Sequence, residues 1–299
     1  MLSVSRTPFL LAHLTGKKRI SSIYFDETKK NNDPEKKPLN CPFCHRYFSR
    51  KDSFTIHYKA CRARIENELK FNKENPGCFK EFKTTNPKER LELAFPLPNN
   101  ERLVMYISGK NGCGKSTFIA NLLKNYVEVY QDRDIFLFSS QEYDDKLDDL
   151  NLENLQRITI DSLATEPLTL DDLRNSICIF DDVDSIANKA VSKAVDDLKF
   201  DILKNGRSHN GDRSDDIDVI ITNHIPNAGH ATKAMIHEAF YYVVFPMGST
   251  ARAIQTICDY AGLDKEHKRR ILSSGSRSVI IHNNYPSYVL TTNEIFLVR

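Results

Sequence analysis

A glycine-rich loop directly follows an apolar segment in the middle third of the chain. Residues 105–117 read MYISGKNGCGKST, so the pattern Gly-x4-Gly-Lys-Ser runs from Gly109 to Ser116. Glycines allow a turn that directs several backbone N–H groups at one anion, while the lysine reaches the β/γ-phosphates and the serine binds Mg²⁺. The pattern therefore predicts a phosphate-binding loop. The residues expected to hold ATP are Gly109, Lys110, Asn111, Gly112, Cys113, Gly114, Lys115, Ser116 and Thr117.

Short apolar segments alternate with helical ones from residue 101 onward. Strands are predicted over 103–108, 135–138, 157–160, 177–180, 219–222, 241–245, 279–282, 288–291 and 295–298, and helices over 116–131, 190–204, 250–260 and 265–272. This alternation is typical of an α/β domain with a mainly parallel sheet. We therefore assign residues 101–299 to one P-loop ATPase domain.

Two carboxylates follow the apolar strand over 177–180. Because a strand that is apolar on both faces is central in a parallel sheet, its carboxyl end should lie beside the phosphate loop. Asp181 is then predicted to bind Mg²⁺ and Asp182 to polarise the attacking water. The alternative is a merely acidic strand end, since Asp is common in turns and Asp184 extends the run of acids.

Polar and basic residues further along the chain are candidates for the rest of a hydrolysis site. Asn223 ends the next apolar strand and is predicted to hold the lytic water and sense the γ-phosphate. A hydrogen-bonded turn residue is the alternative for Asn223, and His224 is read as structural. Arg207 and Arg252 are candidates for the cation that a neighbouring subunit supplies to the transition state, and Arg213 is not excluded.

Four residues upstream have the spacing of a metal site. Cys41, Cys44, His57 and Cys61 follow the pattern C-x2-C-x12-H-x3-C. Two cysteines on a hairpin and a His/Cys pair on a helix form a closed tetrahedral site, so a structural Zn²⁺ in a ββα finger is predicted over 41–61. A single finger contacts only about 3 bp. Both DNA binding and protein docking therefore remain open for it.

Charge is divided unevenly along the chain. Residues 1–100 carry 20 Lys and Arg against 11 Asp and Glu, while residues 101–299 carry 22 against 29. A basic N-terminal third suggests a polyanion partner, most simply nucleic acid, or else a solvated tail. We predict a basic disordered arm over 1–40 and a charged helical linker over 62–100. The cysteine pattern favours a reducing intracellular compartment, and no apolar run reaches the ~20 residues that cross a bilayer.

Several further segments accompany these motifs in a fixed order. They are NGRSH at 205–209, ITNHIP at 221–226, AFYYVVFP at 239–246 and STAR at 249–252. With the loop and the acidic strand, this order resembles the FtsK–HerA superfamily of DNA-pumping ATPases. It is most similar to the poxvirus-type genome-packaging ATPases, over about residues 101–298. The phosphate loop is shared with many NTPases, so the Gly-Arg…His stretch and the Phe-Pro strand end carry the specific resemblance.

The resemblance implies a RecA-like core, a homo-oligomeric ring and ATP-driven movement of double-stranded DNA into a capsid. Capsid proteins would be partners, and the host cytoplasm, virus factory or virion the location. Lys115, Ser116 and Asp181 would then take the roles given above, as would Asp182 and Asn223. The chain departs from the family at three places. Asn223 stands where Gln is frequent, and an insert at 209–217 leaves the role of Arg207 open. The zinc finger predicted over 41–61 is not a general feature of the family.

Two other functions stay open at this point. One is a zinc-finger DNA-binding regulatory protein whose NTPase domain acts as a switch instead of a motor. The other is a phosphotransferase such as a nucleoside kinase, which needs an arginine-rich lid and an acceptor pocket. The sequence shows neither, and two acids followed by a polar strand end favour water as the acceptor.

Overall fold

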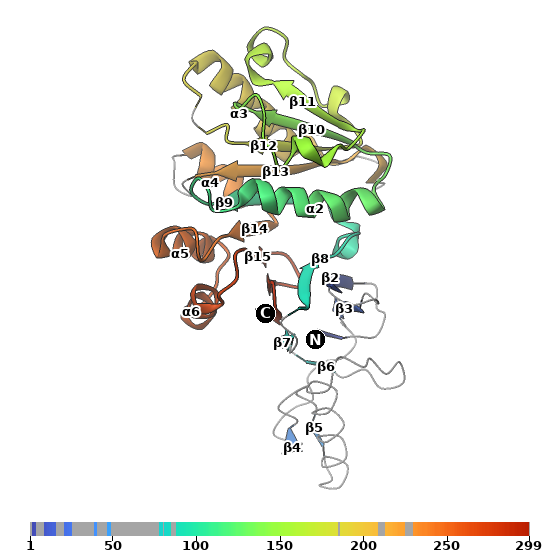
Figure 1. Cartoon of the computed structure of the whole chain (residues 1–299), viewed down its shortest axis with the longest axis vertical. Coiled ribbons are helices and arrows are strands. Elements are labelled where there is room, and N and C mark those ends of the chain that lie inside the picture. Colours follow the sequence, from blue (N-terminus) through green and yellow to red (C-terminus); the bar gives the residue numbers. More distant parts are fainter. Residues whose placement is uncertain are drawn as a thin grey trace. The chain divides into compact units, whose positions relative to one another are not determined.

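The computed structural model divides the chain into two units, Met1–Asn99 with Pro286–Arg299, and Asn100–Tyr285. The four predicted zinc ligands and about half of the predicted helical linker lie outside the described residues. Those described are 2–3, 9–15, 21–25, 39–40, 47–48, 78–79, 81–84, 88–184, 186–208, 213–224 and 230–298 (Figure 1).

A mainly parallel sheet forms the centre of the unit Asn100–Tyr285. Its strand order is β11-β10-β12-β13-β9-β14-β15, with parallel pairing from β11 to β14 and antiparallel pairing of β15 with β14. The predicted sheet is thus confirmed. The strands are β9 (Val104–Ser108), β10 (Asp134–Ser139), β11 (Leu155–Thr159), β12 (Ser176–Asp181), β13 (Ile217–Asn223), β14 (Tyr241–Val244) and β15 (Val279–His282).

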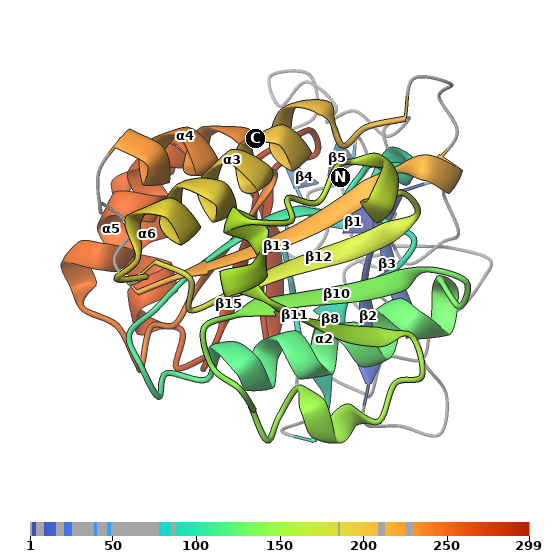
Figure 2. The same ribbon diagram turned by 90° about the horizontal axis from the view of Figure 1, so that it is seen from above.

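Helices cover both faces of this sheet. The connection from β9 runs to β10 on one side, whereas those from β12 and β13 run the other way, so right-handed crossovers place α2 opposite α3 and α4. Figure 2 shows this arrangement. The helix α4 was not predicted from the sequence. The helices are α2 (Lys115–Val129), α3 (Lys189–Asn205), α4 (His230–Glu238), α5 (Ala251–Tyr260) and α6 (Lys265–Ser273).

The central strands are buried along their whole length, as their continuous apolar sequences require. Every residue of β9, β12 and β13 is buried. On α2 the buried positions recur every three or four residues, so one stripe of the helix packs on the sheet. Those positions are Ile119, Leu122, Leu123 and Tyr126.

A buried cluster of charges fixes the beginning of β13. Asp218 is fully buried and accepts hydrogen bonds from Arg213 Nη2 at 2.6 and 2.8 Å, Arg133 Nη1 at 2.9 Å and the Tyr126 hydroxyl at 2.7 Å. Its Oδ1 also accepts from the N–H of Leu103 at 2.7 Å. Arg213 is only 8 % exposed and held by these bonds. A conformationally free arginine finger at this position is therefore disfavoured.

Removing the charge of Asp218 should destabilise this unit strongly. Asp218→Asn keeps the shape but leaves the buried guanidinium of Arg133 without a carboxylate and that of Arg213 with only Asp216, at 3.5 Å. Such changes cost about 3–5 kcal/mol. Urea unfolding should show a correspondingly lower midpoint. The matched control is Asp161→Asn, the same change at an exposed residue. Equal midpoints for the two variants would contradict the stabilising role of the cluster.

The N-terminal unit contains antiparallel strands where a disordered arm was predicted. One sheet has the order β6-β1-β3-β2-β8, made of β6 (Cys78–Phe79), β1 (Leu2–Ser3), β3 (Ser21–Phe25), β2 (Phe9–Thr15) and β8 (Arg90–Leu93). Leu11, Leu14 and Ile23 are buried in it. The prediction of disorder over 1–40 is wrong for β1, β2 and β3, because apolar side chains that pack together outweigh the basic composition. The prediction of a helical linker over 62–100 is wrong for β6 and β8, which are strands.

The last strands of the chain group with this N-terminal unit. β16 (Tyr288–Thr291) pairs with β17 (Glu294–Leu297), which pairs with β7 (Glu81–Lys83), all antiparallel. Both strands were predicted from the sequence, the first at 288–291 and the second at 295–298, but as part of the ATPase domain. A short pair, β4 (Leu39–Asn40) and β5 (Tyr47–Phe48), also lies in this unit. Among the described residues, none of the helices has the length and hydropathy of a membrane span.

Candidate phosphate-binding site

The glycine-rich loop joins β9 to α2 and has the backbone geometry that its sequence predicts. Gly112 and Gly114 have φ angles of 74° and 105°, in the left-handed region that other residues rarely adopt. Lys115 is the first residue of α2 and is 6 % exposed. Its Nζ donates to the carbonyl of Gly109 at 3.2 Å. The loop therefore holds a buried ammonium at the amino end of a fifteen-residue helix, where the backbone also favours an anion.

Close packing against the segment after β14 fixes the other side of the loop. A Cβ at Gly248 would lie 2.6 Å from the Cβ of Cys113, and one at Gly109 would lie 2.8 Å from the Phe245 ring. Neither contact is possible for a larger residue. The Phe-Pro strand end and the following turn, which carried part of the sequence resemblance, thus pack directly on the phosphate loop.

The two acids at the end of β12 lie beside this loop. Asp182 Oδ1 is 3.2 Å from Lys115 Nζ. Asp181 is 3 % exposed and accepts a hydrogen bond from the Thr222 hydroxyl at 2.9 Å. The same hydroxyl oxygen accepts from the N–H of Asp182 at 3.0 Å. Strand β13, between β12 and β9, therefore links the acid pair to the loop strand.

Asn223 lies at the same edge, but its side chain is directed at α4. The residue is 3 % exposed and its Nδ2 donates to Thr232 Oγ1 at 3.5 Å. Its backbone carbonyl accepts from the N–H of Gly109 at 3.1 Å. Asn223 thus ties the end of β13 to the first residue of the loop through its backbone carbonyl, while its side-chain amide donates to a residue of α4.

His224 is the residue of this strand end that touches the acids. Its Nδ1 lies 3.0 Å from Asp184 Oδ1, and its Nε2 lies 3.3 Å from Asp182 Oδ1 and in hydrogen-bond contact with Asn111 Oδ1. Its backbone N–H donates to Asp184 Oδ2 at 2.9 Å. One imidazole therefore connects the acids that follow β12, the end of β13 and the phosphate loop. The sequence signal for this contact was the position of His224 directly after Asn223, at the end of the same strand.

The two candidate arginines lie at opposite edges of the sheet. Gly206 accepts a backbone hydrogen bond from Ile217, the first residue of β13, at 2.8 Å, so Arg207 lies at the edge where β13 begins. Arg252 follows the turn that packs on the phosphate loop and lies at the edge where β13 ends. Both side chains are exposed. Within one chain, the structure brings Arg252 and not Arg207 to the side of the acids.

Burial changes the acid–base behaviour of Asp181. Desolvation, followed by the neighbouring charge of Asp182, raises the pKa of Asp181 to about 6. A buried carboxylate beside a second carboxylate suits a hard divalent cation, which prefers oxygen ligands, and the serine of the phosphate-loop pattern supplies another oxygen. Ser116 and Asp181 are therefore the residues that could hold Mg²⁺. Among the described residues there is no cluster of three or more His, Cys, Asp or Glu for a metal.

Because the pKa of Asp181 is raised on folding, ionisation of its carboxyl group should lower the free energy of unfolding of the metal-free protein. The unfolded chain releases the proton near pH 4 and the folded chain near pH 6, so stability falls between these values and is level above them. Asp181→Asn should therefore gain about 2–3 kcal/mol relative to wild type on going from pH 4 to pH 7. Denaturant unfolding in EDTA measures this, and a pH-independent difference would contradict it.

Comparison with known proteins gives one sequence relative and several similar folds. No family model matches the chain. The uncharacterized protein V3 of Sputnik virophage is 30% identical over 201 residues, which are 66% of this chain and 78% of that protein.

Solved structures that are similar include the genome packaging NTPase B204 of Sulfolobus turreted icosahedral virus 2 in complex with AMPPCP. It is 12% identical with a TM-score of 0.41, over 65% of this chain and 97% of that one. The pCW3 conjugation coupling protein TcpA is 11% identical with a TM-score of 0.41, over 64% and 60%. EccC of Thermomonospora curvata is 14% identical with a TM-score of 0.38, over 70% and 38%.

Proposed function

The chain belongs to the family of the virophage protein V3, and we propose that it is an ATP-hydrolysing motor that moves double-stranded DNA during genome packaging. One observation carries the hydrolytic part of the proposal. The phosphate loop, the acid pair on β12 and the polar end of β13 meet at the carboxyl edge of one parallel sheet. Ligands bind at this edge in open α/β folds.

The loop residues bind the nucleotide in this proposal. Backbone N–H groups of residues 109–117 hold the phosphates, and Lys115 neutralises charge on the β/γ-phosphates. Ser116 and Asp181 hold Mg²⁺, which supplies further charge neutralisation when bound. The buried position of Lys115 supports this role, because an ammonium acts more strongly where water is excluded.

Asp182 is the proposed general base. Its carboxylate is partly exposed at the sheet edge and lies within reach of Lys115 and His224. It can therefore accept a proton from a water that attacks the γ-phosphate. We assign the sensing role to Asn223, with His224 as the group that positions Asp182 against the loop. Arg252 and Arg207 remain the proposed cations for a neighbouring subunit, so the proposed assembly is a ring of identical chains.

The action on DNA and the location are inferred from sequence. The order of motifs resembles DNA-pumping ATPases, and the relative V3 is a virophage protein. We propose a viral protein that works in the host cytoplasm, virus factory or virion with capsid proteins as partners. We also propose that residues 41–61 form the zinc finger predicted from Cys41, Cys44, His57 and Cys61 and that residues 101–299 contain the ATPase.

DNA-stimulated hydrolysis tests the motor function. Phosphate release by the full chain should rise several-fold with long double-stranded DNA, and less with short duplexes at equal nucleotide concentration. An unchanged rate would contradict the motor. If DNA does not stimulate hydrolysis, and Cys41→Ser abolishes DNA binding while Lys115→Ala leaves it intact, the result supports a regulatory switch instead.

A further inference from the structure

A basic segment stands out on the otherwise acidic unit Asn100–Tyr285. Residues 251–277, which contain α5 and α6, carry six Lys and Arg against three Asp and Glu. The other residues of 100–285 carry 15 against 25. Charge of one sign gathered on a short stretch, against an opposite background, attracts a polyanion locally even when the whole unit repels it. Solubility alone would not require such a segregation.

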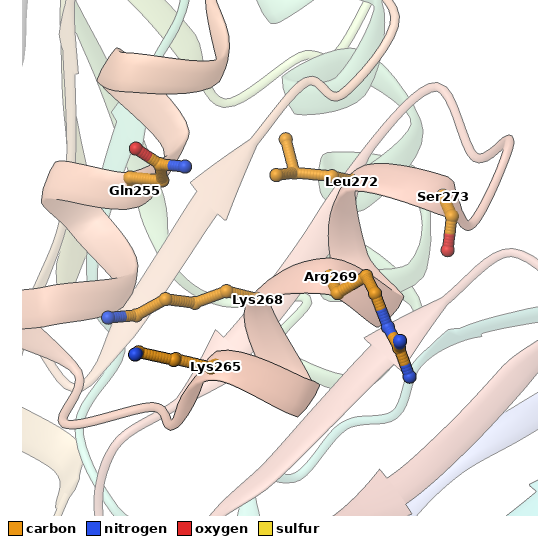
Figure 3. Close-up of a pocket in the computed structure, with 6 residues that line it drawn as sticks. All are labelled: Gln255, Lys265, Lys268, Arg269, Leu272 and Ser273. Atoms are coloured by element: carbon orange, nitrogen blue, oxygen red, sulfur yellow. The ribbon is translucent and has the colours of Figure 1, made fainter.

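Three of these basic side chains line an open groove that α5 and α6 form. The groove has a volume of about 370 Å³, and Figure 3 shows Lys265 and Lys268 extending in the same direction beside α5, with Arg269 turned away from them. Its lining residues are Gln255, Lys265, Lys268, Arg269, Leu272 and Ser273.

Several of these cations have no acidic partner. Lys268 is paired with Asp259 on α5. In contrast, Lys265, Arg269 and Arg277 are exposed and have no ion pair within the described part of the chain. Binding of a phosphate to an exposed cation without an ion pair costs little free energy, because no existing salt bridge must be broken. Lys265 and Arg269 are four residues apart on α6, so their backbones are separated by about 6 Å along the helix.

We propose that this surface, defined by Lys265, Lys268 and Arg269 on α6 with Gln255 on α5, binds the phosphate backbone of double-stranded DNA. Separate cations along a shallow groove suit a repeating polyanion better than a single small anion, which a closed pocket would surround. A membrane surface is disfavoured, because none of the large exposed apolar side chains among the described residues belongs to α5 or α6. The inference rests on the proposed action on DNA.

The surface is also connected to the nucleotide site through one short turn. Gly248 is three residues before the start of α5. Its backbone packs so closely on Cys113 of the phosphate loop that a Cβ there would clash. Thr250 caps α5 by accepting from the N–H of Ala253 at 3.3 Å. A displacement of α5 by bound DNA would therefore act on the segment that fixes one side of the loop. This gives a physical route from DNA contact to the rate of hydrolysis.

The test is the salt dependence of DNA binding by the full chain without nucleotide. The slope of log K against log salt becomes shallower by about 0.9 for every phosphate that the protein no longer neutralises. Lys265→Ala/Arg269→Ala should therefore lower the slope by about 2 and the affinity at 0.1 M salt at least about tenfold, equally for unrelated sequences. Basal hydrolysis without DNA should be unchanged, since neither residue touches the phosphate site.

The matched control removes the same charge elsewhere. Lys124→Ala/Lys193→Ala changes exposed lysines of α2 and α3, and should leave the slope within about 0.5 of wild type. Equal slopes for both double variants would overturn the inference while leaving the motor intact if DNA still stimulates hydrolysis. Weaker binding without a change of slope, or stronger binding to anionic vesicles than to DNA, would also overturn it. Normal DNA binding without stimulation would instead contradict the proposed function alone.

Discussion

Lys115→Ala is expected to lower ATP hydrolysis by about 10³-fold or more. The ammonium is buried at the start of α2 and faces both the loop carbonyl of Gly109 and the carboxylate of Asp182. Its removal deletes the charge that the β/γ-phosphates would meet in a poorly solvated site, and it leaves Asp182 without its nearest cation. Steady-state phosphate release and the affinity for a fluorescent ATP analogue measure the two effects separately.

A second lysine on the same helix provides the control. Lys124 is exposed on α2, so Lys124→Ala makes the same chemical change and removes the same charge from the helix. Its hydrolysis rate should stay within about twofold of wild type, because an exposed charge at this distance is screened by salt. Retention of more than a tenth of wild-type activity by Lys115→Ala would exclude the phosphate role that we propose.

Asp182→Asn should lower the hydrolysis rate by about 10²–10⁴-fold while nucleotide affinity is kept. The amide has the same shape as the carboxylate but cannot take a proton from water. Binding should persist because the phosphates are held by the loop and by Lys115, which the substitution frees from its ion pair. The expected signature is therefore a fall in kcat with KM unchanged or lower.

Asp184→Asn distinguishes a base from a merely acidic loop. Asp184 is the third acid of the run and bonds to both the ring and the backbone N–H of His224. If the acids act only through their summed charge, the two variants should lose activity to a similar degree. If Asp182 is the base, its variant should be at least about tenfold slower than that of Asp184. Both variants lose one negative charge, so they have the same net charge and differ only in which carboxylate is removed.

Much of the ATPase unit could be predicted from sequence because its strands are apolar on both faces. Continuous apolar segments such as 177–180 and 219–222 are typical of buried strands in a parallel sheet. The crossover rule then fixes the handedness of the connections between them. The predicted helices begin and end within two residues of those observed, since caps such as Asp264 mark the start of α6. The mutual approach of the loop and the acids follows from parallel pairing.

Other features depend on contacts that no local pattern encodes. The small helix α4 follows a stretch rich in glycine and proline, and its position matters because Thr232 binds the amide of Asn223. The role of Thr222 was likewise hidden within an apolar strand, since only tertiary pairing brings its hydroxyl to Asp181. In the N-terminal unit, a basic composition concealed strands whose partners lie far along the chain, as for Thr15 and Arg90.

The buried cluster at Asp218 also sets the phase of strand β13. Side chains of a strand alternate between faces, so a slip of one residue would move every side chain of β13 to the other side of the sheet. Asp218 can satisfy Arg133 and Arg213 in one alignment only, and Thr222, four positions later, then shares its face and meets Asp181. The buried charges around Asp218, at the start of β13, therefore fix the register of the strand. The same register places the Thr222 hydroxyl, near the other end of β13, where it bonds to Asp181 and Asp182.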